Sequence, residues 1–204
     1  MSSDLYNADN LLDTAVLEDE NMNNTTGTNN KKKKSKLFQS KEYEIAYNLQ
    51  EINDDINAIK AYRNIIDNFI KNKKSSVDDQ FLIKVIEASI KNIGMIYAKN
   101  DLLDDFQSFF LFLRIDIFPL LPKAKTAKII RDLMANISNA KSATIDAQLL
   151  IIKDAIIWCK KEKRTFLKQR MEARLANLLQ KAGKYKESLN IISILTREVK
   201  KIDD

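Results

Sequence analysis

Turn-forming residues are scarce in this chain, and their scarcity limits what it can fold into. The 204 residues include only three glycines, Gly27, Gly94 and Gly183, and two prolines, Pro119 and Pro122. Sheet proteins of this size need many more such residues, because β-hairpins reverse at Gly, Asn-Gly or Pro. Hydrophobic residues nevertheless make up 45% of the chain, enough for a core. The sequence therefore predicts an all-α protein whose helices are joined by short connections.

Apolar residues recur every three or four positions after residue 37, as they do along the buried stripe of a helix. Breaks in this pattern fall at 72–76, 99–101, 119–122, 137–142 and 182–184. Helices of similar length between tight turns predict a right-handed solenoid of antiparallel helix pairs over 37–204, similar to tetratricopeptide-type repeats, with an irregular helical bundle as the alternative. The stripes are Leu82, Ile86, Ile90, Ile93 and Tyr97; Ile145, Leu149, Ile152, Ile156 and Cys159; Leu167, Met171, Leu175, Leu178 and Ala182; and Tyr185, Leu189, Ile192, Leu195 and Val199.

One helix pair carries the pattern of close repeat packing most clearly. Leu175, Ala176 and Leu179 precede a chain reversal at Gly183, and an aromatic and a small residue follow it. A similar cluster containing Gly94 lies about two repeats earlier, at roughly 40 residues a repeat. Two further aromatic residues, in the stretch 158–166, are assigned to the apolar core. The residues predicted to pack the repeats together are Gly94, Tyr97, Trp158, Phe166, Leu175, Ala176, Leu179, Gly183, Tyr185 and Ser188.

Residues 1–36 differ from the rest in composition. Residues 1–30 hold six acidic residues and no Lys or Arg, and are rich in asparagine; a lysine run follows at 31–36. Such blocked charge and low apolar content predict a disordered segment. The lysine run is a candidate nuclear localisation signal or a solvated linker. A short helix formed on a partner is also possible, through Leu11, Leu12, Ala15, Val16 and Leu17.

The residue types needed for catalysis are largely missing. Histidine is absent and Cys159 is the one cysteine, which excludes Cys/His zinc sites, Ser-His-Asp triads and Cys-His dyads. Paired acidic residues fall in turns and helix ends, and no glycine-rich phosphate loop occurs. We therefore expect a non-catalytic protein with no cofactor or metal. No apolar run is long enough for a membrane span, and no basic-then-apolar signal opens the chain. This predicts a location in the cytoplasm or nucleus.

Two clusters of basic residues are candidate protein interfaces. One recurs at helical steps after Pro122, and the other lies between two apolar stripes. Such clusters attract acidic protein surfaces. Nucleic-acid binding and simple solvent exposure are the alternatives, and nearby acidic residues make the nucleic-acid interpretation the weaker of the two functional ones. The candidate interface residues are Lys123, Lys125, Lys128, Arg131, Lys160, Lys163 and Arg164.

Several stretches resemble one protein family. Residues 157–169, IWCKKEKRTFLKQ, are similar to its EWAKSEKRTFLRQ, and the final REVKKIDD at 197–204 to its RELKKMDD. KAKTAKIIR at 123–131 resembles KAKAARLVR, and SIKNIGMIYAK at 89–99 resembles SILELGSLLAK. The family is non-ATPase regulatory subunit eleven, a scaffold of the 26S proteasome lid that belongs to the PCI-domain proteins. The resemblance runs from about residue 40 to the end and does not cover 1–36.

The resemblance implies an arm of helix-pair repeats that clamps the regulatory particle to the core particle in ubiquitin-dependent degradation, without catalysis. The implied partners are other lid subunits, the ATPase ring and the outer (α) ring of the core particle. Paralogous scaffolds of the signalosome and of translation initiation share this architecture and are an alternative. Family members continue with further repeats and a winged-helix PCI module, whereas this chain stops at Asp204. FLRIDIFPLLP at 112–122 replaces the family's arginine-proline corner, so we expect local differences there.

A solenoid that stops without a capping repeat leaves an apolar groove open at its end. We therefore expect the helix 185–202 to fray or self-associate.

Overall fold

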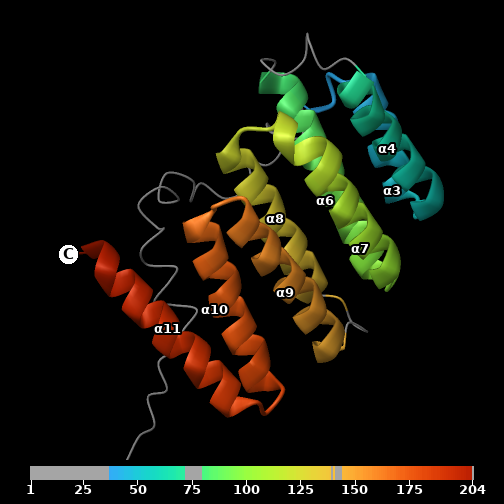
Figure 1. The fold of residues 1–204 in the computed structure, drawn as a ribbon. Helices are drawn as coiled ribbons and strands as arrows, with labels where there is room; N and C mark the ends of the chain where they lie inside the picture. The colour runs from blue at the N-terminus through green and yellow to red at the C-terminus, as the bar shows by residue number, and fades with distance from the viewer. Residues whose placement is uncertain (1–36, 72–79, 139, 141–143, 204) are drawn as a thin grey trace, which may run out of the picture.

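The computed structural model describes residues 37–71, 80–138, 140 and 144–203. Over these residues the chain is helical, with no strand (Figure 1). The expected disorder of 1–36 lies outside the described residues. The elements are α3 (Lys41–Glu51), α4 (Asp55–Lys71), α6 (Gln80–Lys99), α7 (Leu103–Phe112), the π-helical turn η1 (Leu113–Ile117), the 3-10 turn η2 (Phe118–Leu120), α8 (Lys123–Ser138), α9 (Ile145–Lys161), α10 (Thr165–Lys181) and α11 (Tyr185–Asp203).

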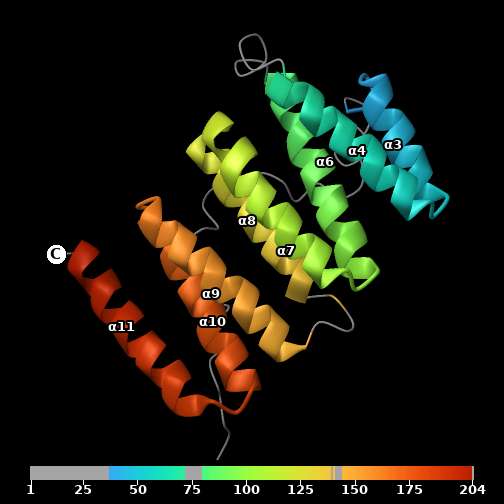
Figure 2. The same ribbon diagram turned by 45° about the vertical axis from the view of Figure 1, so that its right-hand side comes forward.

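The helices form successive pairs along one direction. The first helices of the pairs begin at Lys41, Gln80, Lys123 and Thr165, which are 39, 43 and 42 residues apart. Figures 1 and 2 show the resulting array, with α3 and α4 at one end and α11 at the other. A single pair cannot bury both of its apolar faces, and stacking the pairs makes one continuous core. The predicted all-helical solenoid of helix pairs, with a repeat of about 40 residues, is confirmed.

Four of the turns between helices share one backbone geometry. Asn53, Asp101, Lys163 and Gly183 all have positive φ, between 53° and 74°. In each turn the next residue donates its amide hydrogen to a carbonyl five residues back, at 2.8–2.9 Å, which is the closing bond of a Schellman motif. Asn and Asp tolerate this conformation better than other non-glycine residues. The chain therefore makes tight turns with few glycines, and the turn at Asn53 was absent from the expected breaks.

Helix α6 lies at the centre of the array and is buried on several sides. It packs against α4, α7 and α8, and twelve of its twenty residues are buried. Gly94 faces α8, where a methyl group built on its Cα would overlap the buried Leu133 side chain. The absence of a side chain at Gly94 therefore lets two helices approach closely.

A buried polar network joins the N-terminal pair to α6. The Asn92 side-chain amide donates to the hydroxyl oxygens of Tyr43, at 3.1 Å, and Tyr62, at 2.7 Å. The Tyr62 hydroxyl in turn donates to Gln50 Oε1 at 2.9 Å. Burial, followed by the nearby Tyr43, raises the pKa of Tyr62 far above its ordinary value. A buried amide costs free energy unless it is hydrogen-bonded, so this network fixes how α3, α4 and α6 meet.

The chain between α7 and α8 departs from a regular helix at the stretch where local differences were expected. The helix widens into η1, tightens into η2 at Pro119 and then enters α8 after Pro122. Phe118 packs against Trp158 on α9 with 5.5 Å between ring centroids. Arg114 reaches the same helix and pairs with Asp154 at 2.6 Å. The irregular connection therefore attaches α9 to the preceding pair.

The prediction of which face of α11 is buried is wrong. Tyr185, Leu189 and Ile192 were expected to face the array but are 63%, 65% and 42% exposed. Ser188, which was also predicted to pack between repeats, is buried, and its hydroxyl donates to the Ala176 carbonyl at 2.8 Å. This bond and the small side chain set the rotation of α11, which turns its more hydrophobic stripe outward.

Replacing Gly94 with alanine tests the close approach of α6 and α8. We expect Gly94→Ala to lower the free energy of unfolding by about 1–3 kcal/mol, as overpacking does in a filled core. At an exposed position inside a helix the same change would raise the free energy of unfolding by about 1 kcal/mol. Urea denaturation followed by circular dichroism measures the difference. The cost should shrink when Leu133→Ala is added, and an unchanged cost in the double variant would contradict contact between these positions.

Candidate protein-interaction site

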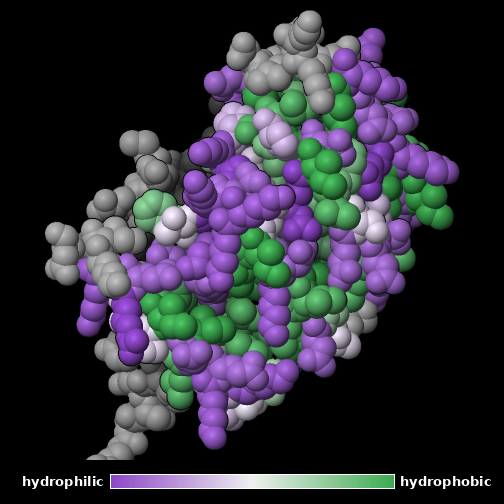
Figure 3. Space-filling model, in the orientation of Figure 1, coloured by the Kyte–Doolittle hydropathy of each residue, from purple (hydrophilic) through white to green (hydrophobic). Residues whose placement is uncertain are grey.

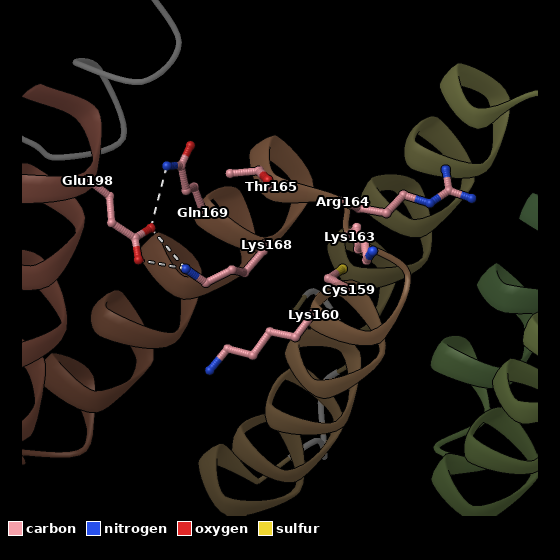
Figure 4. A pocket seen from close by; sticks show the side chains of 8 residues that line it. All are labelled: Cys159, Lys160, Lys163, Arg164, Thr165, Lys168, Gln169 and Glu198. Carbon is pink, nitrogen blue, oxygen red and sulfur yellow. Dashed lines mark hydrogen bonds and ion pairs between the residues drawn. The ribbon is translucent and has the colours of Figure 1, made fainter. Parts of the chain in front are cut away.

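The turn between α9 and α10 gathers one of the two predicted basic clusters. Lys160, Lys163 and Arg164 line an open hollow of about 420 Å³, together with Lys168 and residues of α10 and α11 (Figure 4). Lys163 is exposed and takes the positive-φ position of the tight turn, with φ of 53°. Lys160 is exposed on the last turn of α9. We refer to Lys160, Lys163 and their neighbour Phe166 as the basic turn.

Arg164 holds the turn in place more than it faces outward. Its guanidinium donates to the Lys123 carbonyl oxygen at 3.1 Å and lies 5.3 Å from the centroid of the Trp158 ring. In Figure 4 it points away from Lys168 and Glu198. These contacts bring the start of α8, with the exposed Lys123, beside the basic turn. They also account for the partial burial of Trp158, which packs on the core as predicted for a repeat-packing residue.

Lys168 also lines this hollow, but it was not among the predicted interface residues. Its ammonium group lies 2.8 Å and 2.9 Å from the two Glu198 oxygens on α11 and 3.2 Å from Glu172. Burial opposes the charged form, but these carboxylates outweigh it and raise the pKa of Lys168. Lys168 lowers the pKa of Glu198 in return, with a smaller contribution from Lys160. The spacing within one helix could not reveal a partner that lies on the next.

The α8 cluster is divided by the fold. Lys125 and Lys128 both pair with Glu87 on α6, with Lys125 at 3.1 Å. Lys123 is exposed and Arg131 is half-buried. Burial opposes ionisation of Glu87, but the hydrogen bonds from Lys128 and Lys125 hold its pKa below the ordinary value. Glu87 therefore neutralises part of the expected basic face along α8, and these ion pairs hold α8 against α6.

The prediction that Phe166 packs between repeats is wrong. Its side chain is 77% exposed, the highest value among the large hydrophobic residues of the described chain. Leu167, one position later, carries the stripe that faces the core, and one residue rotates a helix by about 100°. The following positions on the Phe166 face, Gln169 and Arg170, are polar, and this was the signal in the sequence. Phe166 thus joins the basic turn as an exposed aromatic residue.

The chemistry of the site is that of a contact surface. The Cys159 thiol lines the hollow, but burial raises its pKa to about 11, so it stays protonated at neutral pH. Within the described ranges no three acidic or cysteine side chains gather in a way that could hold a metal ion. Figure 3 shows hydrophobic residues at the surface between hydrophilic ones over α9 and α10. An exposed aromatic residue that is close in sequence to two exposed lysines suits an acidic protein surface with an apolar centre.

Comparison with known proteins shows which family the chain belongs to. Residues 39–182 match the family described as the 26S proteasome regulatory subunit RPN6 N-terminal domain. The chain belongs to this RPN6 N-terminal family. It is 38% identical over 122 residues to the 26S proteasome non-ATPase regulatory subunit 11 homolog of Arabidopsis thaliana, 60% of this chain and 29% of that protein. It is 32% identical over 130 residues to the regulatory subunit RPN6 of Saccharomyces cerevisiae, covering 64% and 29% of the two chains.

The match to the probable regulatory subunit rpn6 of Schizosaccharomyces pombe is longer, with 29% identity over 161 residues. It covers 79% of this chain and 36% of that one. The chain therefore spans about a third of the length of the curated RPN6 relatives it matches. The family named by the resemblance is confirmed by these matches. Among the described helices, none combines the length and hydrophobicity that crossing a membrane requires.

Replacing Glu87 with glutamine tests how α8 is fastened. We expect Glu87→Gln to lower the free energy of unfolding at pH 7 by about 1–2 kcal/mol, because a nearly buried carboxylate with two charged partners is lost. The depressed pKa of Glu87 stabilises the fold above its unfolded value of 4.5, and this contribution disappears as the pH falls below it. Urea titrations at pH 7 and pH 3.5 should therefore show the difference shrinking. Glu44→Gln, an exposed change on α3, is the control, and an equal effect of both variants at pH 7 would contradict the role of Glu87.

Proposed function

We propose that this chain is a non-catalytic scaffold in the lid of the 26S proteasome regulatory particle. Its helical-repeat arm holds the lid against the core particle in ubiquitin-dependent protein degradation. The partners are other lid subunits, the ATPase ring and the outer (α) ring of the core particle, and the site of action is the cytoplasm and nucleus. Membership of the RPN6 N-terminal family is the observation that carries this proposal.

Stiffness between repeats supports a role in holding two bodies together. Arginines join neighbouring pairs at three points along the array. Arg63 on α4 lies 4.3 Å and 4.8 Å from the ring centroids of Phe109 and Phe112 at the end of α7. Arg114 pairs with α9, and Arg164 binds the start of α8. A guanidinium fixed by directional contacts resists sliding better than apolar packing alone, so the arm transmits force along its length.

The basic turn is the contact point that we assign to this arm. Lys160 and Lys163 line the hollow, Phe166 follows Lys163 by three residues at the start of α10, and all three residues are exposed. Aromatic residues ringed by charge are typical interface anchors, since the ring supplies buried area and the charges steer the partner. The partner surface should therefore be acidic with an apolar recess.

Nucleic-acid binding is the second candidate, and the exposure of Phe166, three residues after the exposed Lys163, is the observation that favours it. Other observations weigh against it. Lys125, Lys128 and Lys168 are paired with glutamates, and Trp158 is packed under Arg164. Too few exposed basic residues remain to follow a phosphate backbone, because such binding needs several adjacent contacts.

The test is capture of partners by the tagged full chain and by Lys160→Glu/Lys163→Glu/Phe166→Ala. We expect the wild-type chain to bind purified core particle or lid, and the triple variant to bind at least about tenfold more weakly, because it loses an anchor and reverses two charges. Surface plasmon resonance gives the affinities. Lys41→Glu/Lys60→Glu, exposed positions on α3 and α4, is the charge-matched control.

Three outcomes would count against the proposal. Equal loss in the control would mean that net charge, and not the basic turn, governs binding. Nuclease-sensitive binding that falls steeply with salt would favour the nucleic-acid candidate. Capture of signalosome or translation-initiation subunits in place of proteasome subunits would assign the chain to a paralogous complex.

A further inference from the structure

Two neighbouring helices on one side of the array carry exposed apolar residues. Leu111 and Ile115 lie one turn apart at the junction of α7 and η1 and are 50% and 63% exposed. Leu150 and Ile157 lie two turns apart on α9 and are 60% and 66% exposed. Single exposed apolar residues are common on protein surfaces, but a group of them on adjacent elements marks a contact site. We refer to these four residues as the α7–α9 face.

The ion pair between Arg114 and Asp154 shows that the four residues open on the same side. Arg114 on η1 and Asp154 on α9 lie 2.6 Å apart, so they mark the sides on which the two segments face each other. At about 100° per residue, the apolar residues of α7 and η1 follow Arg114 by about 60–100° around the helix axis, and those of α9 precede Asp154 by about 40–60°. Helices α7 and α9 run in the same direction (Figure 2), so these opposite rotations turn all four side chains toward one face.

Acidic residues border the α7–α9 face on one side and basic residues border it on the other. Around α7 and η1, the exposed Asp105 and the half-buried Asp116 lie beyond the apolar pair, on the side away from α9. Around α9, the exposed Lys153 and Lys160 lie beyond its apolar pair, on the side away from α7. Asp146, in the first turn of α9, is the one acidic residue on this second border. The face is therefore apolar in its centre, acidic along α7 and mainly basic along α9.

The α7–α9 face is a side of the array and not one of its ends. Helix α7 belongs to the second helix pair and α9 to the third, and each of these pairs has a neighbouring pair before and after it. Pairs stacked beyond α11 would lengthen the array without covering this side. We propose that the α7–α9 face is a docking surface for an amphipathic α-helix of another protein, with basic residues along its border next to α7 and acidic residues along its border next to α9.

A second copy of this chain fits the face less well. Asp105 and Asp146 lie nine and eight residues before Arg114 and Asp154, so at about 1.5 Å per residue they stand at nearly the same level along the two helices. If α7 of one copy lay over α9 of another, Asp105 would meet Asp146 of the second copy. If α7 lay over α7, two acidic borders would meet. Like charges disfavour both arrangements, whereas a separate helix can place basic residues opposite each acidic side chain.

A synthetic peptide of known pattern tests the docking surface in the full chain. The probe is a stapled helix of about 18 residues, or five turns, with a leucine stripe, lysines on one border and glutamates on the other. Methyl NMR of the isotope-labelled chain locates the contact. We expect the methyl signals of the α7–α9 face to shift and those of Ile45 and Ile52 to stay unchanged, although these two residues are 59% and 71% exposed. Equal shifts at Ile45 and Ile52 would overturn the proposal, because the peptide would then bind any exposed apolar side chain.

Substitutions on the face provide a second measurement. We expect Ile115→Gln/Leu150→Gln to weaken peptide binding at least about tenfold in fluorescence anisotropy, since two apolar anchors are lost. Ile45→Gln/Ile52→Gln is the matched control and should bind the peptide as the wild type does. All four positions are exposed, so both variants keep the core, and circular dichroism verifies this. Equal affinity of the wild type and Ile115→Gln/Leu150→Gln would contradict the docking surface.

The charged borders are tested by changing the peptide. Versions with glutamate on both borders or lysine on both borders should bind at least about threefold more weakly, since each meets one border of like charge. Equal binding of the three peptides would overturn the assignment of the borders. Sedimentation velocity that shows the wild-type chain dimerising, and Ile115→Gln/Leu150→Gln remaining monomeric, would assign the face to a second copy and would also overturn the proposal. None of the substitutions touches the basic turn, so this docking surface and the proposed scaffold function fail or stand separately.

Discussion

The close approach of α6 and α8 at Gly94 is the contact on which the array depends. Helix α6 contacts α4 of the N-terminal pair on one side and α8 of the third pair on the other, so its position sets how these two pairs are placed relative to each other. Without a side chain at Gly94, the buried Leu133 can enter the space between the helices. Close packing at this point also brings Glu87 within reach of Lys125 and Lys128. The absence of a side chain at Gly94 thus permits the ion pairs that hold the same two helices together.

The polar contacts between pairs are enclosed at the N-terminal end and partly exposed beyond α8. The α3–α4–α6 junction is sealed by hydrogen bonds from Asn92 inside the core. At the α9 junction, Arg114 and Arg164 add polar contacts to the packing of Phe118 on Trp158. Helix α11 is attached by Ser188 and by the Lys168–Glu198 pair. Partly exposed ion pairs stabilise less than buried hydrogen-bonded packing. Local stability should therefore fall from the N-terminal to the C-terminal end of the described solenoid.

Much of this architecture could be predicted from periodicity and from the scarcity of turn residues. The stripe that ends at Tyr97 and the reversal at Gly183 follow from the spacing of apolar residues and from backbone conformation, which are local properties. The turn at Asn53, the exposed Phe166 and the orientation of α11 could not be predicted in this way. The turn at Asn53 lacks the glycine or proline that marks a break in the pattern. The other two depend on which of two neighbouring faces meets a partner helix, and a buried Ser188 that bonds across to Ala176 decides the orientation of α11 against its more hydrophobic stripe. The partner of Lys168 was hidden for the same reason.

The basic turn and α11 share one hollow, and this links contact at the turn to the position of the last helix. Lys160 and Lys163 lie on the α9–α10 side of it, and Glu198 lies on the α11 side. An acidic partner that approaches Lys160 also approaches Lys168, and it competes with Glu198 for the same ammonium group. Because Glu198 supplies the charged tether of α11, such competition would loosen the helix at the edge of the array. Charge at the turn and orientation of α11 are therefore coupled through a single lysine, whereas the N-terminal end of the solenoid has its polar network enclosed and stays fixed.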